Sequence, residues 1–155
     1  MISAVDSAEP FYTGLLELRR QQRRARQTLP LRSDEDVVAL RRQVRERAVA
    51  IGLSLVDQTK LVTAASELAR NTIKYGSGGE VHLDALDDGR HHGIGLIFAD
   101  RGAGIADLDM ALRDGYTTGG GLGLGLGGSK RLVDEFEIDS RTGEGTAVSV
   151  VKWKR

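Results

Sequence analysis

Hydrophobic residues recur every three or four positions in two long stretches of the chain, residues 33–52 and 54–76. This spacing places them on one face of an α-helix, so both stretches are predicted to be helices. Each begins with a serine followed by an acidic residue and ends at a glycine, which are typical start and stop signals. The apolar positions are Val37, Leu40, Val44, Ala48 and Ile51 in the first helix, and Leu61, Ala64, Ala65, Leu68 and Ile73 in the second.

Four later stretches alternate apolar and polar residues or are rich in β-branched residues, as strands are. The first two are separated by DDGRHHG, which predicts a hairpin. A short helix is expected at 106–114, and another is expected to begin with SKRLVDEF at Ser129. The order predicts an α+β sandwich, with helices packed on one face of a mainly antiparallel mixed sheet. The predicted strands are residues 80–86, 93–100, 136–141 and 146–153.

The first 31 residues differ from the rest of the chain, because they contain both prolines and the arginine-rich stretch LLELRRQQRRARQ. A helix here would have only three leucines as its apolar face. Charge runs of this kind are usually solvated, so a flexible extension is expected, and a partner-binding arm is the alternative. We therefore divide the chain into an N-terminal extension, residues 1–31, and one domain, residues 32–155.

Composition narrows the classes of function. The formal net charge is zero, which gives no general attraction to nucleic acid or to an anionic membrane. There is no cysteine, and hence no disulfide or thiolate chemistry. The chain lacks an apolar run of membrane-spanning length and a recognisable signal peptide. A cytoplasmic protein with neither nucleic acid nor membrane as partner is expected.

The stretch TTGGGLGLGLGG, residues 117–128, contains seven glycines. It includes a G-x-G-x-x-G pattern, but no strand leads directly into it and no βαβ unit surrounds it, as a dinucleotide-binding fingerprint requires. It also lacks the Gly-Lys-Ser/Thr order of a Walker loop. Alternating glycines weaken regular structure, so we expect a loop that closes backbone amides over phosphates, although the leucines alone are compatible with simple core packing.

Two further stretches carry polar residues in informative positions. Glu67 and Asn71 are four residues apart in SELARNTIKY and share one helical face. Asp100 ends a hydrophobic strand and is followed by a glycine-containing turn, DRGAGI. Taken singly, the first pair is compatible with a solvated helix face, and Asp100 with a cap of the next helix.

Together, and in this order, the three stretches resemble the ATP-binding fold shared by gyrase, Hsp90, MutL and histidine kinases, the Bergerat or GHKL fold. Its N box corresponds to Glu67–Asn71, and its two glycine boxes to residues 100–104 and 119–125. GEGT at 143–146 is a weaker match. In sequence, the segments TAASELARN, GLGLGLGGSKRLVDEFEI and VKW are most similar to those of RsbT-type serine/threonine switch kinases. Ala103 and Gly127 depart from the family pattern, in which proline is frequent at both positions.

The resemblance implies roles for individual residues in binding ATP. Asp100 would accept a hydrogen bond from the adenine amino group, supported by Thr146, while Asn71 would hold Mg²⁺ and Lys74 would reach a phosphate. Glu67 would be the catalytic base toward the substrate hydroxyl. The loop residues next to the base would be Gly102, Gly104 and Ile105, those of the lid over the phosphates Gly121, Leu122, Gly123, Leu124 and Gly125, and those at the start of the next helix Ser129 or Lys130.

The resemblance also implies a function, a partner-switching protein kinase of bacterial stress signalling with ATP and Mg²⁺ as cofactors. Members of this group phosphorylate STAS-domain antagonist proteins, and bind and activate a PP2C-type phosphatase. Two alternatives remain open. One is an anti-sigma factor kinase of the RsbW or SpoIIAB type, which sequesters a sigma factor, and the other is a non-catalytic nucleotide-dependent binding module.

Overall fold

The computed structural model describes residues 9–113 and 125–155, which form five helices and five strands. The order of these elements follows the sequence prediction from α2 onward, and every predicted strand is present within one or two residues of its expected bounds. The elements are α1 Thr13–Glu17, β1 Arg23–Leu31, α2 Asp34–Ala50, α3 Leu55–Gly76, β2 Gly79–Asp87, β3 His92–Asp100, α4 Leu108–Ala111, α5 Gly125–Arg131, β4 Glu135–Arg141 and β5 Gly145–Trp153.

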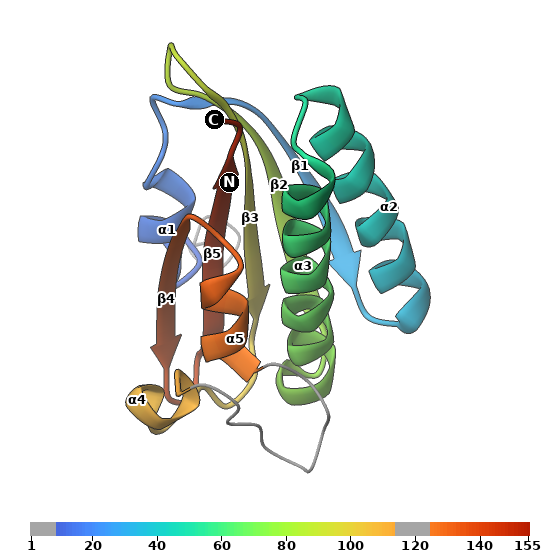
Figure 1. Cartoon of the computed structure of the whole chain (residues 1–155). Coiled ribbons are helices and arrows are strands. Elements are labelled where there is room, and N and C mark those ends of the chain that lie inside the picture. Colours follow the sequence, from blue (N-terminus) through green and yellow to red (C-terminus); the bar gives the residue numbers. More distant parts are fainter. Residues whose placement is uncertain (1–8, 114–124) are drawn as a thin grey trace, which may run out of the picture.

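The five strands form one sheet in the order β1-β2-β3-β5-β4, and all neighbouring strands are antiparallel (Figure 1). β2 and β3 form the predicted hairpin, in which Gly79 pairs with Asp100 and Asp87 with His92. Gly89 in the connecting turn has a φ of 93°, a conformation that glycine adopts without strain. The sheet of the described residues is therefore antiparallel throughout rather than mixed.

The two long helices begin close to where the sequence predicts, but only one start is stabilised as expected. The Ser54 hydroxyl accepts a hydrogen bond from the backbone N–H of Asp57, which caps α3. The Ser33 side chain makes no capping hydrogen bond. Instead, the Asp36 carboxylate accepts from the backbone N–H of Arg32 just outside α2.

The main hydrophobic core lies between one face of the sheet and the helices α2, α3 and α5. We call this the inner face. Alternate strand residues point into this core, as the period of a strand requires. The largest fully buried side chains include Phe98, Leu31, Leu40, Leu61, Leu68, Leu83, Ile94 and Leu96.

The arginine-rich stretch is not the solvated tail that the sequence analysis favours. Arg23–Leu31 forms β1 and pairs antiparallel with β2, from Arg23 opposite Leu86 to Leu31 opposite Gly79. Leu31 is fully buried in the main core. The expected division after residue 31 therefore falls at the end of a strand of the same sheet. Pro30 is compatible with this strand because β1 is at the edge of the sheet.

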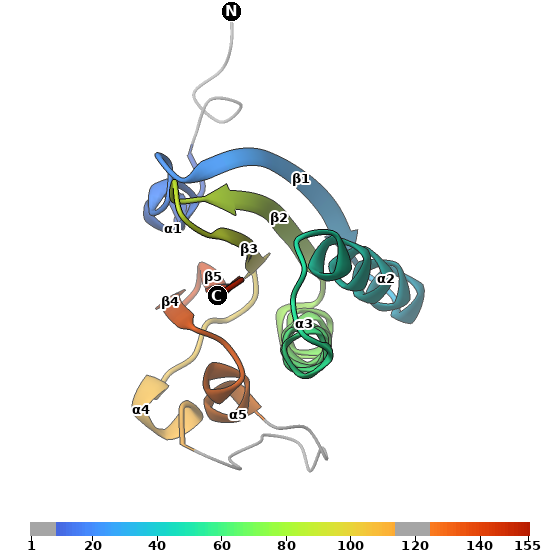
Figure 2. The ribbon, with the colours of Figure 1, turned by 45° about the horizontal axis from the view of Figure 1, so that its top comes forward.

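The predicted helices lie on one face of the sheet as expected, but α1, which the sequence analysis does not predict, lies on the other. Figure 2 shows α1 on the side of the sheet opposite α2 and α3. Tyr12, just before α1, is 6% exposed and packs against Ile97, Ala99 and Ala147 on this outer face. The N-terminal segment, residues 10–22, thus covers part of the face that the prediction leaves open.

The helix after the glycine run begins earlier than expected. α5 spans Gly125–Arg131, so it starts within the glycines, and Ser129 and Lys130 lie in its last turn rather than at its start. The expected helix at 106–114 is reduced to Leu108–Ala111, where the Asp107 carboxylate accepts from the N–H of Met110. None of the helices in the described ranges is long and apolar enough to cross a membrane.

Candidate nucleotide-binding site

Three structural elements that carry predicted site residues meet at one end of the molecule. α3 ends, β3 ends and α5 begins at the lower end of the view in Figure 1. Asp100 is the last residue of β3 and pairs with Gly79, three residues after the end of α3. Thr146, the second residue of β5, lies beside it. The sheet register therefore places Asp100 and Thr146 in contact.

The Asp100 carboxylate is held by two backbone amides. Its Oδ1 accepts hydrogen bonds from the N–H of Gly102 at 2.8 Å and from the N–H of Thr146 at 3.2 Å. Within the described part of the chain, Oδ2 accepts no hydrogen bond. Burial raises the pKa of Asp100 above its usual value, and the two amide hydrogen bonds oppose this shift. The site thus presents one fixed, half-buried carboxylate oxygen with free acceptor capacity.

Glycines allow the chain to pack closely around Asp100. A Cβ added to Gly76, the last residue of α3, would lie 2.3 Å from the Cβ and Cγ of Asp100. A Cβ on Gly102 would lie 2.9 Å from the Cα of Gly76, and one on Gly145 would lie 2.2 Å from the carbonyl oxygen of Asp100. The end of α3, the loop after β3 and the start of β5 therefore approach Asp100 more closely than any side chain would allow.

A pair of hydroxyl groups supports the two loops around Asp100. Ser140 Oγ and Thr146 Oγ1 are 2.9 Å apart, and Ser140 Oγ also accepts from the backbone N–H of Ile105 at 2.7 Å. Gly104 has a φ of 82°, and a Cβ there would lie 2.6 Å from the carbonyl oxygen of Arg141. The first glycine box is thus tied to the turn between β4 and β5.

The N-box residues lie on α3, but no hydrogen bond or ion pair within the described residues joins them to the Asp100 cluster. Glu67 is mostly buried, with a side-chain exposure of 16%, and its Oε1 lies 3.6 Å from Nη1 of Arg70. Asn71 is half-buried and Lys74 is exposed, with its Nζ 5.2 Å from the centre of the Tyr75 ring. α3 itself connects the N-box residues to the Asp100 cluster, because the helix runs without interruption to Gly76.

Most of the predicted lid lies outside the described residues, namely Gly121, Leu122, Gly123 and Leu124. Gly125 is described and begins α5 with a φ of 71°. Two residues later, a Cβ on Gly127 would lie 2.2 Å from the carbonyl oxygen of Leu112. Gly127, where proline is frequent in the family, therefore allows α5 to pack directly on the end of α4. This close packing also explains why glycines are helical here, despite their low helix propensity.

Sequence analysis missed three residues of this site. Gly76 reads only as a helix stop, Gly145 only as part of a weak match, and Ser140 carries no signal at all. The ends of α3, β3 and β5 must be brought together before the close approach of these residues becomes visible.

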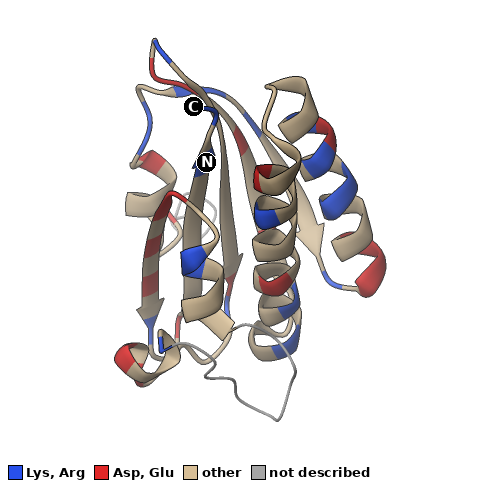
Figure 3. Ribbon diagram, in the orientation of Figure 1, with Lys and Arg blue, Asp and Glu red and all other residues tan. Residues whose placement is uncertain are grey.

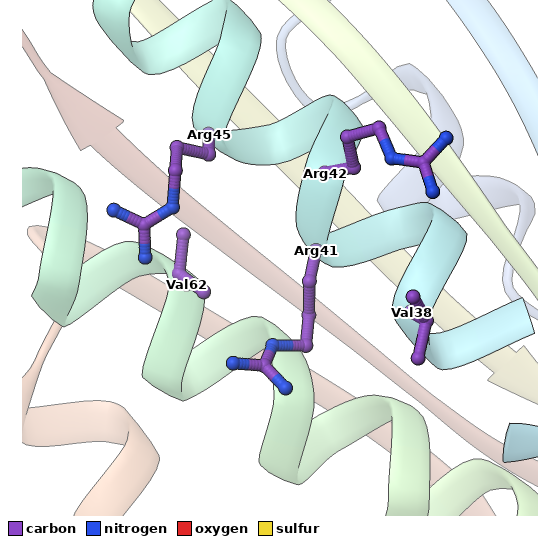
Figure 4. Close-up of a pocket in the computed structure, with 5 residues that line it drawn as sticks. All are labelled: Val38, Arg41, Arg42, Arg45 and Val62. Carbon is purple, nitrogen blue, oxygen red and sulfur yellow. The ribbon is translucent and has the colours of Figure 1, made fainter. Parts of the chain in front are cut away.

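A hollow between α2 and α3 is a separate feature. Figure 4 shows its lining, Val38, Arg41, Arg42, Arg45 and Val62. It contains none of the predicted site residues and no carboxylate. We therefore place the candidate nucleotide site at Asp100 and not here.

Comparisons with known proteins identify the family of the chain. Residues 31–152 match the family model of the histidine kinase-like ATPase domain. The chain is 43% identical over 120 residues to the serine/threonine-protein kinase RsbT of Bacillus subtilis, which covers 77% of this chain and 90% of that protein. It is 30% identical over 106 residues to an anti-sigma F factor of Anoxybacillus flavithermus, with 64% of this chain and 71% of that protein covered.

Among solved structures, the RsbU and RsbW domains of a Mycobacterium tuberculosis protein share the fold, with a TM-score of 0.55 and 21% sequence identity. That match covers 85% of this chain and 34% of the other one, so the chain corresponds to about a third of that structure. The family match and the identity to RsbT lead to one conclusion: the chain belongs to the histidine kinase-like ATPase family and, within it, to the RsbT-type serine/threonine kinases.

Proposed function

We propose that this protein transfers the terminal phosphoryl group of ATP, with Mg²⁺, to a serine or threonine of a STAS-domain antagonist protein, and so switches partners in stress signalling. The observation that carries the proposal is the Asp100 carboxylate in its glycine cradle. In an RsbT-type kinase such a site needs an acceptor for a purine amino group, and the cradle holds the Asp100 carboxylate so that Oδ2 can accept.

Asp100 would select adenine over guanine. Because Oδ1 is already engaged by two amides, Oδ2 is the oxygen left to accept from the exocyclic amino group of adenine. Guanine has a carbonyl oxygen at that position and would face the carboxylate with a second acceptor. Thr146 would support this contact by holding Oδ1 in place, and Gly102, Gly104 and Ile105 would form the loop beside the base.

The phosphate end would be formed by α3 and the lid. Asn71 has the kind of oxygen that Mg²⁺ prefers, and this ion usually takes only one or two protein ligands together with substrate phosphates and water. No cluster of three or more His, Cys, Asp or Glu able to hold a metal exists within the described ranges, so a phosphate-dependent ion fits better than a protein cage. When bound, Mg²⁺ would neutralise charge on the phosphates. Lys74 and the lid, Gly121–Gly125, would add a cation and backbone amides.

Glu67 would orient the hydroxyl of the protein substrate and accept its proton. Phosphoryl transfer requires mainly positioning and charge neutralisation, so a single well-held carboxylate is enough for this role. The partial burial of Glu67 and its neighbour Arg70 restrict the positions that this side chain adopts. After transfer, release of the phosphorylated partner would free the kinase to bind and activate a PP2C-type phosphatase.

The anti-sigma relatives support a second candidate. Their 30–31% identity over about two thirds of this chain is compatible with a kinase that also sequesters a sigma factor. A non-catalytic nucleotide-dependent module is less well supported, because both Glu67 and Asn71 are present.

One experiment separates these functions. The protein is incubated with labelled ATP, Mg²⁺ and candidate STAS-domain proteins, while binding to sigma factors is measured in parallel. Label transfer to a serine or threonine without sigma binding is expected. Sigma binding would favour the second candidate, and nucleotide binding without any transfer would favour the third.

A further inference from the structure

The arginine-rich stretch fastens the N-terminal segment, residues 10–22, to the outer face of the sheet. Nη1 of Arg23 and Nη2 of Arg26 both donate to the carbonyl oxygen of Leu16, at 2.8 and 2.9 Å. Arg26 also forms two hydrogen bonds to the mostly buried carboxylate of Asp84. These arginines are therefore engaged within the molecule rather than available as a basic arm. We call residues 10–22 the strap.

Arg19 holds the far end of the strap. Its guanidinium donates to Oε1 of Glu135 and to Oγ of Ser149, both at 3.0 Å, and its side chain is only 11% exposed. Figure 3 shows that acidic positions follow one another along β4, so this edge of the sheet attracts a cation. Arg20, the next residue, differs: its side chain is 78% exposed and, among the residues that the structure describes, pairs only with Glu17, at 3.7 Å.

The other end of the strap packs directly behind the residues that hold Asp100. Tyr12 contacts Ala99 and Ala147, and these alternate along their strands with Asp100 and Thr146, whose side chains point to the opposite face. The Phe11 ring lies 5.9 Å from the guanidinium carbon of Arg141, which follows Ser140. Thr146 and Ser140, which lie next to Asp100, thus each have a chain neighbour in contact with the strap.

Tyr12 is itself fixed by a buried polar group. Its hydroxyl lies 3.2 Å from Nε2 of His82, and Nδ1 of His82 lies 2.9 Å from the hydroxyl of Thr28 on β1. Glu80 on β2 approaches the same imidazole at 3.2 Å. The ring of Tyr12 is therefore held both by apolar contacts and by this hydrogen bond.

We propose that the strap is a positioning device for the nucleotide site, which holds Asp100 and Thr146 in register for the adenine base from the opposite face of the sheet. This inference rests on the proposed nucleotide site. The strap contacts all five strands, through Arg26, His82, Ala99, Ala147 and Glu135. Releasing it loosens the end of β3 and the start of β5, which lie at the proposed adenine site.

The test compares Arg19→Ala, which releases the strap at its far end, with Arg20→Ala as the matched control. Arg19 contacts Glu135, six residues along β4 from Arg141, and Ser149, three residues along β5 from Thr146, so its removal touches no residue of the site directly. Affinities for ATP and for inosine triphosphate, which has a carbonyl oxygen in place of the adenine amino group, are measured by calorimetry with Mg²⁺. We expect Arg19→Ala to weaken ATP binding about 3- to 30-fold, the usual range for coupling through packed elements.

Inosine triphosphate distinguishes a displaced Asp100 from a general loss of structure, because it lacks the amino group that Asp100 would bind. Its affinity is expected to change less than that of ATP, so that the preference for ATP falls, while Arg20→Ala retains both affinities. Tyr12→Ala should reproduce the loss, and Tyr12→Phe, which keeps the packing, should restore most of it. Thermal unfolding of each variant defines a temperature at which it is folded, and the affinities are compared there.

The outcomes separate this inference from the function on which it rests. If the unchanged protein binds neither nucleotide, the proposed nucleotide site is wrong. If it prefers ATP and folded Arg19→Ala shows the same affinities and preference, the strap does not position the site. An equal loss for both nucleotides would also contradict the inference, because it indicates a general loss of structure rather than a displaced Asp100.

Discussion

Replacing Asp100 with asparagine should change which purine the protein prefers. In Asp100→Asn, the amide oxygen is expected to take the place of Oδ1, because two backbone N–H groups donate to it. The amide nitrogen then occupies the place of Oδ2 and donates instead of accepting. A donor facing the amino group of adenine is repulsive, whereas the carbonyl oxygen of hypoxanthine or guanine would accept from it.

The structure sets the expected magnitude. The proposed adenine contact would be a hydrogen bond to a charged group, worth about 1.5–3 kcal/mol, so its loss should weaken ATP binding about 10- to 150-fold. The free energy of unfolding should fall far less, because burial already disfavours the charged form of Asp100 and the neutral amide keeps both amide contacts. Binding and stability are thus expected to separate in this variant.

The assay is calorimetric titration of ATP and of inosine triphosphate, with urea unfolding alongside. Asp34→Asn is the matched control, because it removes the same charge from an exposed position in the first turn of α2. We expect ATP affinity to fall and inosine triphosphate affinity to be retained or to rise. Equal losses for both nucleotides, or an unchanged ATP affinity, would refute the assignment of Asp100 to the base.

Three further changes test other parts of the structure. Glu67→Gln should bind ATP normally but lose about 10²- to 10⁴-fold in label transfer to a STAS-domain protein, and transfer at the normal rate would show that Glu67 is not the base. Gly127→Ala should lower the free energy of unfolding by about 1–3 kcal/mol in urea, because its Cβ would lie 2.2 Å from the Leu112 carbonyl oxygen, while Gly14→Ala, which meets no atom within 4 Å, should not. Burial lowers the pKa of His82, so the folded state binds fewer protons than the unfolded one, and the free energy of unfolding should fall as the pH drops below about 6.5. In His82→Gln this fall between pH 7.5 and 5.5 should be smaller, and an identical slope would place the titrating group elsewhere.

The sequence predicts the elements of this fold well where hydrophobic periodicity and end signals agree. α3 shows both, with Ser54 at its start and Gly76 at its end, and the structure matches them. β1 fails because its residues, RRARQTLPL, show neither a strand pattern nor an apolar face. Its place is determined by pairing with β2 and by the contacts of its arginines with α1 and Asp84, which are tertiary interactions.

The candidate site shows the same division. Asp100 and the glycine boxes are visible in the sequence because their order resembles a known family. Gly76 and Ser140 are not, because each matters only through a residue distant in the chain: Gly76 through its approach to Asp100, and Ser140 through Ile105 and Thr146. The start of α5 at Gly125 is missed for a related reason, since local propensity argues against helical glycines and tertiary packing overrides it.

Release of the strap should change nucleotide affinity but not the rate of phosphoryl transfer, because α3 carries Glu67 independently of the strap. The helix touches Asp100 at Gly76 and carries Glu67 nine residues earlier, a separation of about 14 Å along an uninterrupted helix. Displacing Asp100 by releasing the strap leaves this helix in place, so the position of Glu67 relative to the phosphates should be retained once ATP is bound. Arg19→Ala is therefore expected to raise the KM for ATP about 3- to 30-fold and to leave kcat within about twofold. Steady-state transfer to a STAS-domain substrate over a range of ATP concentrations measures both constants. A variant with reduced kcat and unchanged KM would show that the strap acts on α3 and the catalytic carboxylate rather than on the adenine end.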